Sequence, residues 1–132
     1  MEALSKKLFH PRVEIRLRSA SSILFKLECG IFNQRDIRHD ILRCSLLDGV
    51  NKSISILLHS TTDHIVDSTS EYYQLVLLLL SIVRFVYQST PLNLASMDIS
   101  TMILGHLYKM KSISDIDNKL GKSLDEVHYL LL

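Results

Sequence analysis

Apolar residues recur along this chain with the spacing of α-helices. Between residues 13 and 31 they fall four and three residues apart, at Val13, Leu17, Ala20, Leu24, Leu27 and Ile31. This spacing places them on one face of a helix. Ile15, Ile23 and Phe25 widen the apolar face, so we expect neighbours on more than one side. No segment alternates apolar and polar residues between turn dipeptides, and strands are therefore not expected.

The same reasoning divides the chain into a series of helices. The predicted ranges are 2–9, 11–29, 34–47, 50–60, 69–88, 96–109, 113–120 and 124–132. Pro11 suits a helix start, and Gly30 suits the left-handed end of the same helix. Asn33 is a predicted N-cap. Gly49 is predicted to end the third helix, and Gly121 to separate the last two.

Two helix starts carry the pattern of a capping box, in which a hydroxyl and a carboxylate three residues later satisfy free backbone N–H groups. One pairs Ser68 with Glu71, and the other pairs Ser123 with Glu126. These pairs predict helices that begin immediately after each serine.

The helix over 69–88 is apolar on almost every side. Its polar residues Gln74, Ser81, Arg84 and Gln88 gather on one narrow strip, and such a helix belongs in the middle of a helical stack. Its apolar run of about twelve residues is shorter than the roughly twenty that cross a bilayer, so no membrane association is expected.

Residues 1–132 are therefore predicted to form one all-α domain of stacked helical repeats, of the armadillo or HEAT kind, an α-solenoid fragment. The last residues, Leu130, Leu131 and Leu132, form an apolar end. We expect this end to contact a partner protein, a second copy or further repeats of a longer protein.

Charge adds little to this picture. Fifteen basic and fourteen acidic residues give a formal net charge of +1, which is too small to predict nucleic acid or anionic lipid as a partner. Arg12, Arg16 and Arg18 are the candidate residues for a protein interface, because arginine is enriched at interfaces. The alternative is that Arg18 pairs with Glu14 one helical turn earlier.

No pattern of catalytic chemistry is present. Cys29 and Cys44 lack metal-ligand spacing and are predicted to be buried apolar residues. The six histidines show no metal-binding motif, and no serine stands in a nucleophile elbow. We therefore predict no enzyme activity, cofactor, metal or small-molecule ligand. The N-terminus lacks the apolar core of a secretory signal, which predicts a cytoplasmic protein.

Residues 112–131 have the outline of a helix-turn-helix, with a turn at Gly121. This outline leaves a nucleic-acid-binding adaptor as the alternative function. The second helix of this outline opens with Asp125 and Glu126, however, and residues 111–132 carry three lysines against four acidic residues. Such a surface repels phosphate, so nucleic acid is disfavoured. An importin-like carrier of basic peptides is a third alternative, but the sequence shows no acidic and asparagine ladder.

The opening helix resembles the start of the rotatin family, which includes the insect anastral spindle proteins. The matching residues are His10, Glu14-Ile15-Arg16, Arg18, Ser22-Ile23-Leu24, Lys26 and Glu28. The apolar helix from Glu71 to Tyr87 and the step from Asn93 through Ile99 to Met110 agree with the layout of that family. One departure is Ser96-Met97-Asp98, which replaces a glycine-containing turn.

The resemblance implies a non-catalytic N-terminal domain of a very long armadillo-like protein. It further implies a location at the centrosome, the centrioles and ciliary basal bodies of the cytoskeleton. The partners would be centriolar proteins, and the role would be centriole assembly, centriole elongation and cilium formation.

Overall fold

The computed structural model describes residues 2–30, 37–60, 65–89, 97–113 and 116–131. Over these residues the chain forms helices and no strand. The helices are α1 (Glu2–Lys7), α2 (Val13–Glu28), α3 (Ile37–Ser60), α5 (Glu71–Ser89), α6 (Met97–Lys111) and α7 (Asn118–Leu131). The all-α prediction is therefore confirmed for the described part of the chain.

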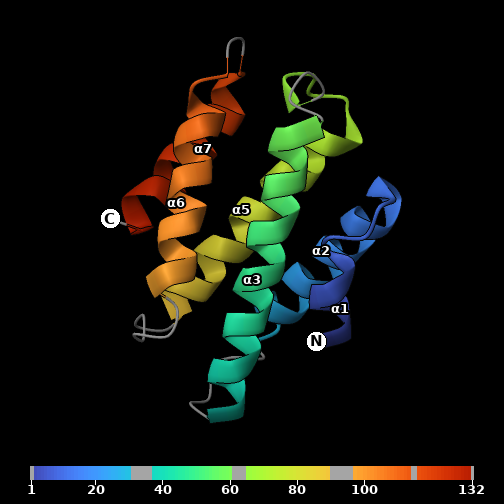
Figure 1. Ribbon diagram of the computed structural model, residues 1–132, viewed down its shortest axis with the longest axis vertical. Coiled ribbons are helices and arrows are strands. Elements are labelled where there is room, and N and C mark those ends of the chain that lie inside the picture. Colours follow the sequence, from blue (N-terminus) through green and yellow to red (C-terminus); the bar gives the residue numbers. More distant parts are fainter. Residues whose placement is uncertain (1, 31–36, 61–64, 90–96, 114–115, 132) are drawn as a thin grey trace.

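The helices pack in two layers (Figure 1). One layer contains α1, α3 and α6 side by side, and the other contains α2, α5 and α7. Across the layers α1 packs on α2, α3 on α5, and α6 on α7. From α2 to α7 consecutive helices alternate in direction (Figure 1). The layers therefore consist of antiparallel helix pairs placed next to one another.

Helix α5 occupies the centre of this arrangement, in contact with α2, α3 and α7. Its buried residues point to several sides: Tyr73, Leu75, Val76, Leu79, Leu80, Ile82, Val83 and Val86. Gln74 and Gln88 are exposed on the predicted polar strip, and the Ser81 hydroxyl donates to the carbonyl of Leu77 at 3.0 Å. The prediction of a central helix with neighbours on both flanks is confirmed. Each fully buried leucine contributes about 1.5–3 kcal/mol.

The other helices each bury one stripe against the same continuous core. In α7 the buried positions are Leu120, Leu124 and Val127, four and three residues apart, as expected for an amphipathic helix. In α2, Ala20, Ile23 and Leu27 are buried, whereas Phe25 is 67% exposed. The prediction that Phe25 widens the covered face is therefore wrong. Helix α1 has six residues and α2 has sixteen, so α1 is too short to cover the whole of α2.

Gly49 does not end a helix, since α3 continues from Ile37 to Ser60. The predicted division into 34–47 and 50–60 is wrong. A Cβ atom on Gly49 would lie 2.6 Å from the carbonyl oxygen of Ser5 in α1. Glycine is therefore needed where α1 crosses α3 closely, and the buried Leu46, Val50 and Ile54 continue the apolar stripe through it.

Gly121 likewise lies inside α7, which is one helix. The predicted helices 113–120 and 124–132 are wrong, as is the helix-turn-helix over 112–131. The helix begins after Asp117, whose carboxylate accepts the backbone N–H of Leu120 at 2.9 Å. Asp117 therefore caps α7, and Ser123 and Glu126 do not form a capping box.

The cap of α5 also differs from the prediction. The helix begins at Glu71, and the Ser70 hydroxyl accepts the backbone N–H of Tyr72 at 3.1 Å. The capping residue is Ser70 rather than Ser68. At the end of α2, Gly30 has a φ of 85°, which confirms the predicted left-handed stop. The predicted N-cap Asn33 lies outside the described residues.

We predict opposite effects of alanine at two glycines inside helices. Gly49→Ala should lower the free energy of unfolding by about 1–3 kcal/mol, because the new Cβ collides with the backbone of Ser5. A Cβ atom at Gly105 would have no other atom within 4 Å. Gly105→Ala should therefore raise the free energy of unfolding by up to about 1 kcal/mol, because alanine has the higher helix propensity. Urea unfolding of both variants tests this. A Gly49→Ala protein as stable as Gly105→Ala would contradict the close crossing of α1 and α3.

Candidate interaction surface

A groove of about 360 Å³ lies between α1 and α2, at the end of the layers where the chain begins. We call it the α1–α2 groove. It is lined by Leu4, Lys7, His10, Ile15, Arg18, Ser19 and Ser22. The apolar side chains Leu4 and Ile15 are half-buried, and Lys7, Arg18 and Ser22 are exposed. The lining therefore combines an apolar part with cations and carries no carboxylate.

Two hydrogen bonds fix the polar character of this groove. The Nδ1 atom of His10 accepts the backbone N–H of Arg12 at 3.0 Å, so the neutral ring carries its proton on Nε2. The buried Ser19 donates its hydroxyl proton to the carbonyl of Ile15 at 2.8 Å. The groups left for a ligand are the donors of Lys7, His10 and Arg18 and the hydroxyl of Ser22.

The three candidate arginines do not form one surface. Arg12 is exposed and lies 3.6 Å from Glu14, so Glu14 pairs with Arg12 rather than with Arg18 as the alternative had it. Arg18 is exposed and lines the α1–α2 groove. Of the three, Arg18 is the exposed arginine that has no ion-pair partner among the described residues.

Arg16 is buried, with an exposed fraction of 3%. Its Nε and Nη1 atoms have no hydrogen-bond partner among the described residues, and its guanidinium lies 6.0 Å from the centre of the Tyr72 ring. Burial lowers the pKa of Arg16, and the charge interaction with Tyr72 opposes this shift. Arg16 therefore faces the interior beside α5 and not a partner.

The predicted C-terminal site is only partly exposed. Leu131 packs against the core, and half-buried Leu130 lines a second hollow, of about 670 Å³, between α5 and α7. There Arg84 of α5 and Glu126 of α7 form an ion pair at 3.1 Å, and the neighbouring Tyr129 is 82% exposed. Leu132 lies outside the described residues.

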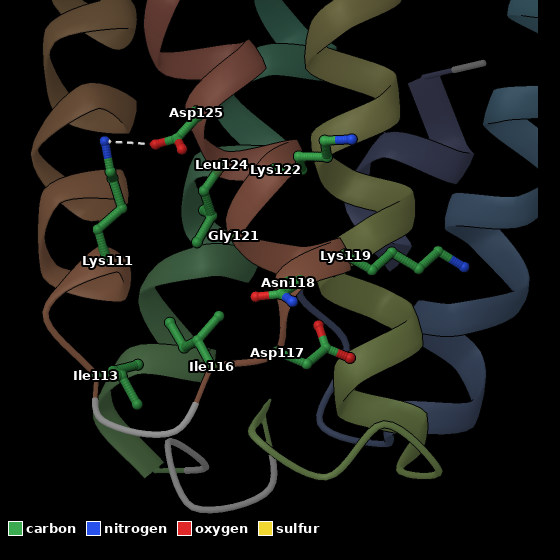
Figure 2. Close-up of a pocket in the computed structure, with 10 residues that line it drawn as sticks. All are labelled: Lys111, Ile113, Ile116, Asp117, Asn118, Lys119, Gly121, Lys122, Leu124 and Asp125. Atoms are coloured by element: carbon green, nitrogen blue, oxygen red, sulfur yellow. Dashed lines mark ion pairs between the residues drawn. The ribbon is translucent and has the colours of Figure 1, made fainter.

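A third hollow, of about 940 Å³, lies between the end of α6 and the start of α7 (Figure 2). Lys111 and Asp125 form an ion pair at 2.8 Å on one side of it. Lys119 and Lys122 point away from this pair (Figure 2). Because the lysines do not converge on one point, this hollow does not form a clamp for an anion.

The start of α7 is joined to α5 by a contact that the sequence did not reveal. The Tyr73 hydroxyl lies 2.8 Å and 2.7 Å from the two carboxylate oxygens of Asp117 and donates to this carboxylate. Burial, followed by the Asp117 hydrogen bond and charge, raises the pKa of Tyr73 to about 12. The Tyr73 hydrogen bond, followed by the Leu120 N–H, lowers the pKa of Asp117.

The sequence prediction missed most of the α1–α2 groove, since Lys7, His10 and Ile15 were not predicted as site residues. The available signal was the spacing of Ile15, Arg18, Ser22 and Phe25, which places them on one face of α2. The sequence alone does not single out that face, because it predicts Ile15 and Phe25 to be core residues.

Both cysteines are free, with Cys29 exposed and Cys44 half-buried, so their predicted burial is wrong for Cys29 and only partial for Cys44. No group of three or more His, Cys, Asp and Glu residues could hold a metal ion within the described ranges. In the same ranges, no helix combines the length and apolarity needed to cross a bilayer.

The fold thus places the chain among all-helical proteins whose helices pack in layers. Comparison of the chain with protein-family models, curated proteins and solved structures finds no match.

We predict that Arg16→Met raises the free energy of unfolding by about 1 kcal/mol. The buried charge of Arg16 loses its hydration, and the Tyr72 ring offsets this only in part because Nε and Nη1 make no hydrogen bond, whereas methionine fills similar space without charge. Urea unfolding measures the change. The matched control is Arg18→Met, which should stay within about 0.5 kcal/mol of the original protein because Arg18 is exposed. A loss of stability in Arg16→Met would show that the guanidinium is favourably paired.

We also predict a pH-dependent stability difference between the original protein and Asp117→Asn. The folded-state pKa of Asp117 lies below its ordinary value of 3.8. Its ionised form therefore contributes stability above that pH, which is lost as the pH falls through the folded-state pKa. The melting temperature of the original protein should exceed that of Asp117→Asn at neutral pH, and the difference should shrink below pH 3.8. A difference that is constant with pH would contradict the charged hydrogen bonds at Asp117.

Proposed function

We propose that this chain is a non-catalytic scaffold domain built from armadillo/HEAT-like helical repeats. The observation that carries the proposal is the order of packing. The pairs α1–α2, α3–α5 and α6–α7 follow one another, and within each layer each helix packs on its equivalent in the next pair. Stacked helical repeats have this nearest-neighbour pattern of contacts.

The resemblance to the rotatin family supports a more specific role. Its matching residues fall mostly on α2, where Arg16 and Ile23 are buried and Arg18 and Lys26 are exposed. We propose on this basis that the chain is the N-terminal domain of a longer centriolar protein. It would bind other proteins at centrioles, the centrosome and basal bodies, and so support centriole assembly, elongation and cilium formation.

The surface of the domain fits a protein-binding role. Its described hollows lie between neighbouring helices and are lined by mixed apolar and charged side chains. Protein interfaces combine apolar contact with a polar rim in the same way. The alternative of a nucleic-acid adaptor is not maintained, because the predicted second helix of its motif is part of the single helix α7.

We predict that the 132-residue chain, fused to a fluorescent protein in ciliated cells, is enriched at centrioles relative to the surrounding cytoplasm. Removal of residues 1–132 from the protein expressed in the cell should reduce its recruitment and give shorter centrioles and fewer cilia. Quantitative fluorescence with a centriolar marker measures both effects.

The control for this experiment is Gly105→Ala, which is expected to preserve the fold and should be recruited normally. An even distribution of the fusion, together with normal centrioles after the deletion, would contradict the centriolar role. That result would not contradict the helical packing described above.

A further inference from the structure

The geometry points to the α1–α2 groove as the docking site for an acidic peptide segment with an apolar anchor residue. This inference rests on the proposed scaffold function and names the chemistry of one partner. The partner segment would carry Asp or Glu on both sides of a Leu, Ile or Phe.

The first argument is charge complementarity. Lys7 and Arg18 stand on opposite helices and both line the groove. Neither has an ion-pair partner among the described residues, whereas Arg12 is already paired with Glu14. The bond from the Arg12 N–H to Nδ1 of His10 leaves Nε2–H as a further donor. Because carboxylates accept hydrogen bonds from such donors, two acidic residues would satisfy the groove.

The second argument is the apolar surface within and beside the groove. Half-buried Leu4 and Ile15 line it, and the exposed Phe25 lies on the same face of α2, ten residues after Ile15. Lys26 is exposed beside Phe25. The exposed surface of α2 beyond the groove thus carries Phe25 with the cation of Lys26 and the carboxylate of Glu28 beside it. An amphipathic segment laid along it would bury Phe25 and meet Lys26.

The composition favours a peptide over a phosphate-bearing partner. A nucleic acid or an anionic membrane is held by many cations spread over a surface, and this groove offers Lys7 and Arg18 around an apolar centre. The half-buried Leu4 and Ile15 gain little from phosphates but are covered by a leucine or phenylalanine side chain. The full chain carries a net charge of only +1.

The test is to select random 12-residue peptides displayed on phage for binding to the 132-residue chain. Fluorescence polarisation with labelled copies of the selected peptides then measures their Kd. We expect enriched peptides with Asp or Glu flanking an apolar residue and a Kd on the order of 10–100 µM. Lys7→Glu with Arg18→Glu should weaken their binding at least tenfold. The milder pair Lys7→Gln with Arg18→Gln should weaken it severalfold. Ile15→Gln should also weaken it, which separates the apolar anchor from charge alone.

The matched control is Lys119→Glu with Lys122→Glu on α7, which makes the same charge change at exposed positions outside the groove. It should bind the selected peptides like the original protein. Circular dichroism melting of every variant confirms that the fold is retained. A 20-base-pair DNA duplex and phosphatidylserine vesicles are tested in parallel.

Three results would overturn the inference. These are the absence of any enriched peptide, enrichment that survives the Lys7 and Arg18 reversals, and binding of DNA or vesicles but of no peptide. A domain that is still recruited to centrioles in any of these cases would retain the proposed scaffold function and bind through another surface. Peptide binding without centriolar recruitment would support the groove as a docking site and contradict the centriolar role.

Discussion

The burial of α5 on nearly all sides is the constraint on which the rest of the structure depends. A helix with leucine, isoleucine and valine in almost every direction has to be covered by α2, α3 and α7 together. Two neighbours in its own layer and one in the other layer satisfy this requirement. The remaining helices each bury one apolar stripe, although Phe25, Met102, Tyr108 and Tyr129 stay exposed on α2, α6 and α7. The two-layer order thus follows from the sequence of the central helix.

The sequence predicted the existence and type of the helices but misplaced several of their ends. Gly49 and Gly121 are predicted to end helices, because glycine has a low helix propensity. In both cases buried residues continue the helix on either side, and their burial outweighs the roughly 1 kcal/mol cost of one glycine. At Gly30 the left-handed conformation follows the local preference, and there the prediction is confirmed.

The contacts that the sequence could not reveal join residues distant along the chain. Tyr73 and Asp117 are 44 positions apart, and Gly49 meets Ser5 across two helices. Arg16 was predicted as a surface residue because arginine is usually exposed, yet the packing of α2 on α5 buries it beside Tyr72. The α1–α2 groove depends on two helices as well, so the sequence identified Arg18 but not the lysine and histidine that accompany it.

The location of the groove follows from the same packing. Most apolar stripes meet a neighbouring helix, and the large apolar side chains that stay exposed among the described residues are Phe25, Met102, Tyr108 and Tyr129. Helix α1 has six residues and α2 has sixteen, so α1 covers only one part of α2, while Ile23 and Leu27 in its second half are buried. Phe25 is exposed there at a cost in hydration that packing elsewhere in the domain avoids. A surface that combines this apolar residue with the exposed Arg18 and Lys26 has the composition of a binding site, because both features gain free energy once an amphipathic acidic segment covers them.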